Sequence, residues 1–291
     1  MEIDVDTKLI PVIGKPLRQS VSYKMGNNIY EIEGLNYFRF PIEVEREYLG
    51  DVLNGLKYMN VSGIGITKPY KVEVMQYLDE IDELAEKIGA VNSIEVRDGR
   101  LIGHNKDGEG FVVFFRREIG REISSTIFFC IGAGGAGKAI CWTLAYRGAR
   151  KIYITDKFED AGEKLVAGIN GDFKSVAEFI PARDLERTRA ALAQSQVLMN
   201  ASGVGMAPNL QDTPLAKELF MPGHIVFDAT YNPKLTQFLK DAQASGCQVF
   251  NGKGMLIGCS MLGFEERTGR PADYETWSKV FDAVMEGSEI R

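Results

Sequence analysis

The chain of 291 residues has only two histidines, His104 and His224. Neither stands in an H-E-x-x-H sequence or in a cluster with zinc-ligand spacing, and no G-x-S-x-G motif accompanies them. The sequence therefore argues against zinc catalysis and against a serine hydrolase triad, and we expect no metal site. His104 precedes a sharp turn and His224 follows Pro222-Gly223, so we expect both to be solvated loop residues.

Cysteine pairs, long apolar runs and excess positive charge are also missing. The four cysteines contain no C-x-x-C pair, and no apolar run reaches the ~18 residues that span a bilayer. The net charge of −6 gives no basic footprint for nucleic acid. Residues 1–6 are acidic, unlike the basic-then-apolar start of a signal peptide. We therefore expect a cytoplasmic monomer or homodimer that acts on a small molecule, with no nucleic-acid or membrane partner.

Glycine, by contrast, is abundant, and three glycines form one motif. Gly132, Gly134 and Gly137 make a G-x-G-x-x-G sequence directly after the apolar run 127–131. In a dinucleotide site the first glycine permits a tight turn, the second lets backbone amides approach a pyrophosphate, and the third lets helix and strand pack closely. Asp156 follows near the separation of about 20 residues at which a carboxylate binds the adenosine ribose. The motif predicts a nucleotide site; the alternative is an ordinary glycine-rich turn.

Apolar runs and amphipathic stretches alternate along the chain in the manner of an α/β protein. Before the motif we expect strands at 8–13, 37–44 and 62–66, helices at 45–60, 70–88 and 109–119, and a hairpin of 91–96 with 100–104. From the motif on we expect strands at 127–131, 151–155, 197–200, 225–228 and 247–250, and helices at 138–148, 159–169, 234–245, 255–267 and 273–286. The second set predicts a Rossmann-type, doubly wound parallel sheet.

The order of these elements predicts two domains, one inserted into the other. The dinucleotide-binding Rossmann domain covers 108–251. A smaller α/β domain for substrate binding and catalysis covers 1–107, and the helices within 252–291 complete it. We expect the substrate to sit in the cleft between the two domains, where polar loops gather at strand ends.

Lys71 and Asp107 are the clearest acid–base pair among those polar residues. Oxidation of a secondary alcohol requires the hydroxyl proton to leave with the hydride, and a lysine held by a carboxylate can accept that proton. In the alternative interpretation Lys71 is a surface charge, and Asp107 only caps the helix 109–119. The residues alone leave both interpretations open.

Eight segments, in this order, resemble the shikimate dehydrogenase family, including its quinate/shikimate dehydrogenase branch, almost from end to end. They are Ser20-Val21-Ser22, Thr67 to Lys71, Gly89 to Ser93, Gly103 to Gly108, Gly132 to Gly137, Asn200 to Met206, Asp228 to Thr236 and Asn251 to Leu256. The resemblance implies that Lys71 and Asp107 are catalytic. It also implies that Ser20 and Ser22 hold the substrate carboxylate, and that Thr67, Asn92 and Asp107 bind ring hydroxyls.

The same resemblance implies positions for the cofactor and for the rest of the pocket. Lys106 and Cys259 fall on substrate-binding positions. The implied cofactor-binding residues are Gly132, Gly134, Gly135, Ala136, Gly137, Asp156, Lys157, Asn200, Ala201, Tyr231 and Gly254.

The chain also departs from the family pattern. Tyr23 replaces the proline after S-x-S, and Gly26 replaces the histidine of H-N. On substrate-facing positions, Gly65 replaces asparagine, Lys106 replaces threonine, and Cys259 replaces glutamine. Loss of two amide side chains removes hydrogen bonds to a polar ligand. We therefore expect plain shikimate to be a poor substrate, and a related cyclic hydroxy or amino acid to be a better one.

The choice of cofactor depends on Thr155-Asp156-Lys157. A carboxylate at Asp156 binds both ribose hydroxyls and repels a 2′-phosphate, which favours NAD, although Lys157 could compensate and admit NADP. Together these features predict an NAD(P)-dependent oxidoreductase that interconverts a hydroxyl and a ketone on a shikimate- or quinate-like cyclic polyol carboxylate. By resemblance this is a step of aromatic amino acid biosynthesis. The alternatives are a methylenetetrahydrofolate dehydrogenase-like enzyme and a non-catalytic ligand-sensing homologue.

Overall fold

The chain folds into two units, each with a six-stranded sheet. The computed structural model describes residues 3–18 and 20–287. Unit 1 comprises residues 1–110 and 256–291, and unit 2 comprises residues 111–255. The boundaries expected from the sequence lie after residue 107 and after residue 251. The expected α/β class is confirmed, and among the described residues no helix is long and apolar enough to cross a membrane.

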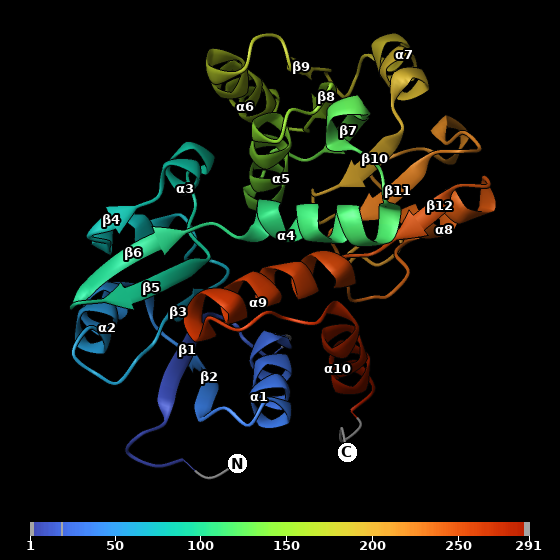
Figure 1. The fold of residues 1–291 in the computed structure, drawn as a ribbon. Helices are drawn as coiled ribbons and strands as arrows, with labels where there is room; N and C mark the ends of the chain where they lie inside the picture. The colour runs from blue at the N-terminus through green and yellow to red at the C-terminus, as the bar shows by residue number, and fades with distance from the viewer. Residues whose placement is uncertain (1–2, 19, 288–291) are drawn as a thin grey trace. The chain divides into compact units, whose positions relative to one another are not determined.

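Unit 1 has a mixed sheet with the strand order β2-β1-β3-β5-β6-β4 (Figure 1). Its elements up to residue 114 are β1 (Lys8–Gly14), α1 (Ser22–Ile32), β2 (Tyr37–Glu43), a 3-10 turn (Arg46–Tyr48), α2 (Leu49–Leu56), β3 (Ile64–Ile66), a second 3-10 turn (Glu73–Tyr77), β4 (Glu80–Ile81), α3 (Glu83–Ile88), β5 (Ser93–Arg97), β6 (Arg100–His104) and α4 (Asp107–Phe114). β1 runs parallel to β2 and β3, whereas β5 runs antiparallel to β3 and β6. The predicted hairpin is confirmed: Asp98 and Gly99 both have positive φ, as a type I′ turn requires.

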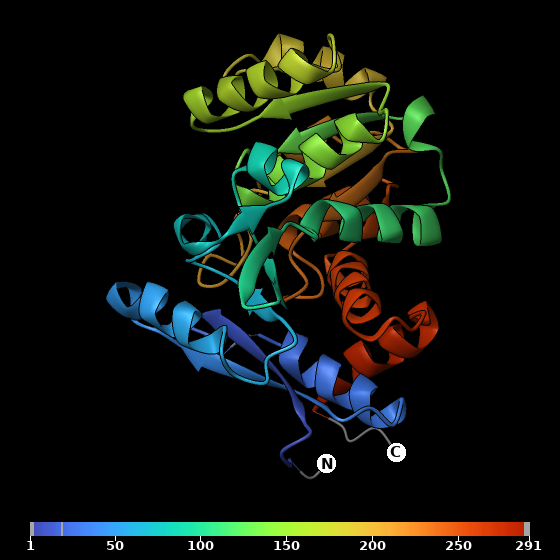
Figure 2. The same cartoon turned by 60° about the vertical axis from the view of Figure 1, so that its left-hand side comes forward.

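Three helices of unit 1 differ from the expectation. α1, which packs against β2 (Figure 2), was not expected, because Gly26, Asn27 and Asn28 are weak helix formers. The expected helix 45–60 is shorter, with only Leu49–Leu56 in α-helix. The expected helix 70–88 is wrong. The Asp79 carboxylate accepts the backbone N–H of Leu101 at 2.7 Å, which holds this segment at the sheet, and Asp82 caps a new helix, α3.

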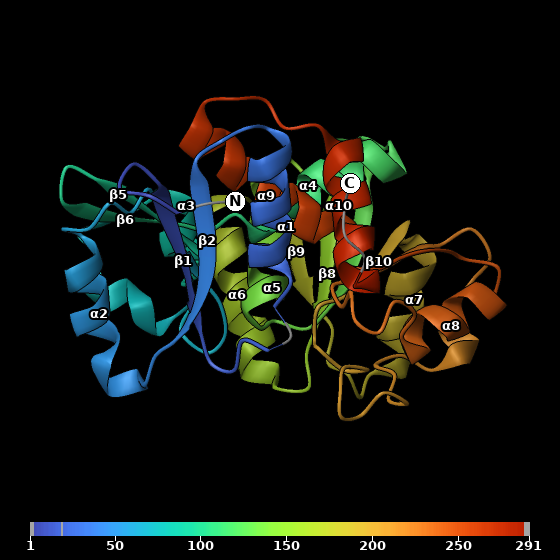
Figure 3. The same cartoon turned by 90° about the horizontal axis from the view of Figure 1, so that it is seen from below.

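The C-terminal helices α9 (Lys253–Thr268) and α10 (Tyr274–Glu286) lie against the first elements of unit 1 from Leu256 onward. The Tyr37 hydroxyl donates to the carbonyl of Arg267 at 3.2 Å, and the rings of Tyr30 and Phe264 stack with centroids 5.9 Å apart. α10 lies beside α1 (Figures 1 and 3). Residues more than 200 positions apart therefore share one hydrophobic core.

Unit 2 has a wholly parallel sheet with the strand order β12-β11-β10-β7-β8-β9. Its elements are a π-helical turn (Phe115–Ile119) that continues α4, a 3-10 turn (Ile123–Ser125), β7 (Ile127–Ile131), α5 (Gly135–Tyr146), β8 (Lys151–Thr155), α6 (Glu159–Asp172), β9 (Ala177–Phe179), α7 (Leu185–Gln194), β10 (Val197–Asn200), a further 3-10 turn (Lys217–Leu219), β11 (Ile225–Asp228), α8 (Gln237–Ala244) and β12 (Gln248–Phe250). The order reverses between β7 and β10, which is the switch point of a doubly wound fold. The predicted parallel sheet is confirmed.

Both faces of this sheet are covered by hydrophobic side chains. On β11, Val226 packs into a cluster with Phe238 and Leu239 of α8. Phe227, the next residue, lies against Phe111 and Phe114 of α4, with ring centroids 5.0 and 5.1 Å away. Adjacent strand residues point to opposite faces, so helices are needed on both sides.

Candidate active site

Lys71, Asp107 and Asn92 meet in unit 1. The Lys71 ammonium donates to Oδ2 of Asp107 at 2.6 Å, and the side-chain amide of Asn92 donates to Oδ1 at 2.7 Å. The side chains of Lys71 and Asp107 are 25% and 13% exposed, so the pair is partly shielded but still open to a ligand. Lys71 and Asp107 are therefore paired as the sequence suggested, and their catalytic role stays a prediction.

Backbone hydrogen bonds fix where these three residues lie. The carbonyl of Lys71 accepts the N–H of Val91 at 2.7 Å, and the carbonyl of Asn92 accepts the N–H of Ile66 at 2.9 Å. Asp107 begins α4, and its N–H donates to the Asn105 side chain at 3.0 Å. Asn105 is itself buried and donates to the carbonyl of Ala90 at 2.9 Å. Asn105 was not among the site residues expected from the sequence, although it orients the turn that carries the Asp107 carboxylate.

Cys259 and Lys106 flank Asp107. The Cys259 sulfur lies 3.3 Å from the carbonyl of Lys106 and 3.9 Å from Oδ1 of Asp107. Burial, and then the Asp107 charge, raise the pKa of the Cys259 thiol well above its usual range, so the thiol stays neutral. The Lys106 ammonium lies 2.8 Å from Glu266 Oε2 on α9. The cation that the sequence adds beside Asp107 therefore has a carboxylate partner elsewhere.

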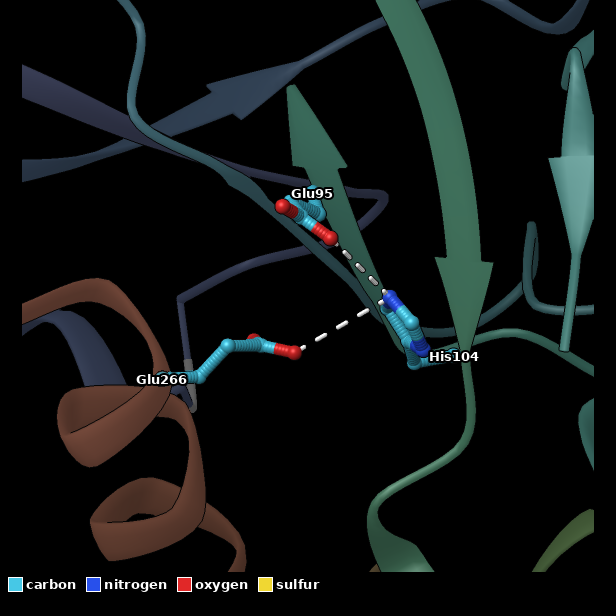
Figure 4. Close-up of side chains that lie close together, drawn as sticks. All are labelled: Glu95, His104 and Glu266. Atoms are coloured by element: carbon cyan, nitrogen blue, oxygen red, sulfur yellow. Dashed lines mark ion pairs between the residues drawn. The ribbon is translucent and has the colours of Figure 1, made fainter. Parts of the chain in front are cut away.

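His104 belongs to the same surface of unit 1, and the expectation of a solvated loop residue is wrong for it. Its Nδ1 lies 2.7 Å from Asp82, and its Nε2 faces Glu95 at 3.7 Å and Glu266 at 3.9 Å (Figure 4). The hydrogen bond to Asp82 raises the pKa of His104, although burial opposes it. Glu95, His104 and Glu266 each offer one atom that could bind a metal ion, and these three atoms lie within 4.8 Å of one another. The ammonium of Lys106 is already bound to Glu266 and opposes a cation there, and Asp82 binds the other nitrogen of His104, so we interpret the group as an ion-pair cluster.

In unit 1, Ser22 begins α1 and Ser20 lies just before it, while Thr67 directly follows β3. The hydroxyl oxygens of Ser20 and Ser22 are 3.3 Å apart. The N–H of Thr67 donates to the carbonyl of Ile13 at 2.9 Å, so the two strand ends are adjacent. A Cβ on Gly14 would lie only 2.5 Å from the Thr67 methyl group, which explains the glycine at the end of β1.

The glycine motif of unit 2 forms a tight connection from β7 to α5. Gly132 has φ +109°, and a Cβ on it would lie 2.6 Å from the backbone nitrogen of Ser202. A Cβ on Gly137 would collide with the carbonyl of Gly132. Nothing lies within 4 Å of the position a Cβ would take on Gly134 or Gly135, at the start of α5. The first and third glycines therefore serve packing, while the start of the helix is open to a phosphate.

Asp156 lies at the end of β8 beside that motif. Its Oδ2 accepts the N–H of Ala133 at 2.6 Å, and its Oδ1 accepts the N–H of Phe158 at 2.8 Å. The Lys157 ammonium lies 4.8 Å from the centroid of the Phe158 ring. Asp156 therefore stabilises the glycine loop by a hydrogen bond to the Ala133 N–H. The same side chain carries the negative charge on which the cofactor prediction depends.

Asn200, expected at the cofactor site, is fully buried and belongs to a polar network of unit 2. Its amide donates to Oδ2 of Asp228 at 3.0 Å, and its Oδ1 accepts the Ser202 hydroxyl at 2.6 Å. The Thr236 hydroxyl donates to the same Asp228 oxygen at 2.8 Å. Burial raises the pKa of Asp228, while these hydrogen bonds oppose the rise. The side chain of Asn200 therefore orders the loop after β10.

The remaining expected cofactor residues follow other strands of unit 2. The N–H of Ala201 donates to the carbonyl of Ile131 at 2.8 Å, and its methyl carbon would lie 3.5 Å from a Cβ on Gly137. Tyr231 is half-buried, and burial raises the pKa of its hydroxyl. Gly254 is buried in the first turn of α9. Their roles remain predictions.

Comparison with known proteins gives matches along most of the chain. Residues 12–94 match the family model of the shikimate dehydrogenase substrate binding domain. Shikimate dehydrogenase (NADP(+)) from Alkaliphilus oremlandii is 35% identical over 272 residues, which cover 92% of this chain and 95% of that protein. A crystal structure of shikimate 5-dehydrogenase from Listeria monocytogenes, in complex with shikimate and NAD, is 34% identical with a TM-score of 0.91, and the match covers 97% and 98% of the two chains. Quinate dehydrogenase from Corynebacterium glutamicum, in complex with NAD, is 27% identical with a TM-score of 0.86, over 95% and 99%.

Proposed function

The chain belongs to the shikimate dehydrogenase family, and we propose that it is an NAD(P)-dependent oxidoreductase that interconverts a hydroxyl and a ketone on a shikimate- or quinate-like cyclic polyol carboxylate. The observation that carries this proposal is the shared carboxylate of Asp107, which binds Lys71 through one oxygen and Asn92 through the other. This is the arrangement that an alcohol oxidation needs at its proton-transfer site.

Lys71 is the proton-transfer group of the proposed reaction. In the oxidation direction its neutral amine accepts the proton of the substrate hydroxyl, and in reduction its ammonium returns that proton to the carbonyl oxygen. Asp107 holds the lysine nitrogen in place and accepts a hydrogen bond from a neighbouring ring hydroxyl. Asn92 keeps the carboxylate from rotating. The nicotinamide, when bound, supplies the hydride acceptor or donor.

We assign the substrate carboxylate to Ser20 and Ser22 and a ring hydroxyl to Thr67. The two serine hydroxyls, 3.3 Å apart, can donate to the two oxygens of one carboxylate. Thr67 follows the adjacent strand, so its hydroxyl can bind the ring to which that carboxylate is attached. Cys259 lines the same site through its contact with Asp107, and Lys106 adjoins it through its backbone N–H, which donates to the Asn92 side chain.

Unit 2 is the proposed cofactor domain. The open start of α5 suits the pyrophosphate, with Gly134, Gly135 and Ala136 as its backbone donors. Asp156 favours NAD, and Lys157 leaves NADP as an alternative cofactor. Both cofactors occur among the relatives, since the Alkaliphilus protein is named for NADP and the Listeria structure contains NAD. The comparisons do not favour the methylenetetrahydrofolate dehydrogenase-like alternative or the sensing alternative. We further propose a cytoplasmic location, because all four cysteines are free thiols, and we keep the monomer or homodimer expected from the sequence.

A turnover screen tests the proposal. The purified protein is assayed with shikimate, quinate and their amino and deoxy analogues, each with NAD and with NADP, and the formation of reduced cofactor is followed by absorbance. We expect NAD- or NADP-dependent oxidation of at least one cyclic hydroxy acid. Absence of turnover for every combination, in a protein that binds cofactor, would overturn the proposed activity.

A further inference from the structure

Arg39 on β2 is a buried cation without a carboxylate partner. Arg39 is only 8% exposed, and its Nε has no hydrogen-bond partner. Within residues 3–18 and 20–287, no carboxylate lies at ion-pair distance from its guanidinium. Burial lowers the pKa of Arg39 to about 10, against an opposing effect of Tyr30 and with a smaller contribution from the charge of Arg267. Burial of an unpaired guanidinium is strongly unfavourable. A residue that served only to pack β2 against α1 would not need this charge.

Two glycines make room for the Arg39 side chain. A Cβ on Gly26 of α1 would collide with Cδ of Arg39 and would lie 3.3 Å from its Nη1. A Cβ on Gly65 of β3 would lie 3.4 Å from Nη2. Asn27 fixes the backbone of Arg39 from both sides, since its amide donates to the Arg39 carbonyl at 2.8 Å and its Oδ1 accepts the Arg39 N–H at 2.7 Å. The guanidinium is therefore held where the side chain of residue 65 would otherwise stand.

That position adjoins the candidate active site. Gly65 pairs with Ser93, the residue after Asn92, and its built Cβ lies 3.4 Å from the Val12 side chain. Val12 and Gly14 project from the same face of β1, and Gly14 adjoins Thr67. Gly65 and Thr67 therefore share one face, and Nη2 of Arg39 reaches that face at residue 65, where it would lie 3.4 Å from a Cβ.

We propose that Arg39 is a substrate-binding residue, which donates through its guanidinium to one ring substituent of the substrate and selects an oxygen over an amine at that carbon. This inference rests on the proposed function. A guanidinium has N–H donors and no acceptor, so it binds hydroxyl, carbonyl or carboxylate oxygens and repels an ammonium group. It thereby supplies the donor that is lost where Gly65 replaces asparagine. Among the amino analogues expected from the sequence, the one that carries its amine at this carbon is therefore disfavoured.

The test is the Arg39→Met variant, which keeps the apolar stem and removes the charge. It is assayed beside Arg270→Met, a matched control at an exposed arginine that pairs with Glu33. We expect KM for the best substrate to rise roughly 10- to 100-fold in Arg39→Met, with a smaller change in kcat, because a charge-assisted hydrogen bond is lost. Thermal stability should be unchanged or higher, because a buried unpaired charge is removed. The control should keep the wild-type KM.

A second measurement identifies the carbon that Arg39 contacts. Wild type and variant are compared on the set of analogues in which each ring hydroxyl in turn is replaced by an amine. In Arg39→Met the ratio of hydroxyl to amine kcat/KM should fall at least about 10-fold for one analogue and stay constant for the others. Arg39→Lys, which keeps the charge and loses the planar fork, serves as the second variant if Arg39→Met does not fold.

The possible outcomes separate the two proposals. If wild type oxidises a cyclic hydroxy acid and Arg39→Met does so with the same KM and the same analogue ratios, the role of Arg39 is wrong and the proposed activity stands. A loss of stability without a change in KM would mark Arg39 as purely structural. If wild type oxidises no substrate in the set, the proposed function itself is wrong.

Discussion

The ammonium of Lys71 lies 2.6 Å from Oδ2 of Asp107, across 36 positions of sequence. The carboxylate cannot turn away, because Asn92 holds its other oxygen at 2.7 Å. A lysine positioned in this way can accept a proton in a fixed direction, which a flexible surface lysine cannot do. The departures from the family pattern leave this pair intact and alter the residues around it.

Lys71→Ala should lower kcat by roughly 10²- to 10⁴-fold, because a positioned acid–base group contributes about that much. Binding of NAD or NADP, followed by fluorescence titration, should be unchanged, since unit 2 carries the proposed cofactor residues. Lys57→Ala is the control, because Lys57 forms an ion pair with Asp79 in the same unit. Near-normal kcat of Lys71→Ala on the best substrate would refute the role given to Lys71.

Asp156→Asn should raise the NADP-to-NAD ratio of kcat/KM roughly 10-fold, because it removes a charge that repels the 2′-phosphate. Asparagine is preferred to alanine here, since its oxygen can still accept one of the two backbone N–H groups that Asp156 binds. Glu159→Gln controls for a general loss of negative charge near the loop. An unchanged cofactor ratio would show that Asp156 acts only as a brace for the glycine loop.

The fold could be predicted where the sequence pattern is local and strong. The apolar strands of unit 2 are confirmed within a residue or two, and the Asp98-Gly99 turn fixes the hairpin. β9 and α7 were missed, because β9 has three residues and α7 buries only a threonine, an alanine and a leucine. The expected helix 70–88 is wrong because the Asp79 contact with Leu101 is tertiary, and no local pattern signals it.

The site residues, too, could be predicted only where a local sequence motif contains them. Lys71 and Asp107 stand in motifs, so the sequence could propose them as a pair. Arg39 stands in an ordinary apolar strand, and its only signal is a charge between Phe38 and Phe40. Its relation to Gly26 and Gly65 appears only when three separate elements fold together. Gly65→Asn, Lys106→Thr and Cys259→Gln together would return the three family residues, but the asparagine at 65 would meet Nη2 of Arg39, so Arg39 would also need to change.

Thr236→Val should destabilise unit 2 by about 1–3 kcal/mol, because it removes a hydrogen bond to the buried carboxylate of Asp228. The substitution also removes the oxygen that caps α8. Urea unfolding followed by circular dichroism measures the change. Ser245→Ala is the matched control, since its hydroxyl bonds only a backbone carbonyl near the surface. Equal stability of the two variants would contradict a structural role for the Asn200–Asp228–Thr236 network.

The two histidines should affect stability with opposite dependence on pH. The pKa of His104 is raised, chiefly by its hydrogen bond to Asp82, so the folded state binds its proton more tightly than the unfolded state. The stability that His104 contributes is full below its ordinary pKa of about 6.5, and it is lost as pH rises through the raised value. We therefore expect the difference in unfolding free energy between wild type and His104→Asn to shrink as pH rises above about 6.5.

His224 should give the reverse slope. It is 5% exposed, its Nδ1 accepts the N–H of Met221, and its Nε2 lies 3.2 Å from the carbonyl of Leu192. The expectation of a solvated residue is therefore wrong here as well, and burial lowers its pKa. The stability that neutral His224 contributes is full above about 6.5 and is lost as pH falls through the lowered value. The difference between wild type and His224→Asn should shrink as pH falls from about 7 to 5. Chemical denaturation of both variants across this range gives two slopes of opposite sign, and slopes of the same sign would contradict the assignment of one of the two shifts.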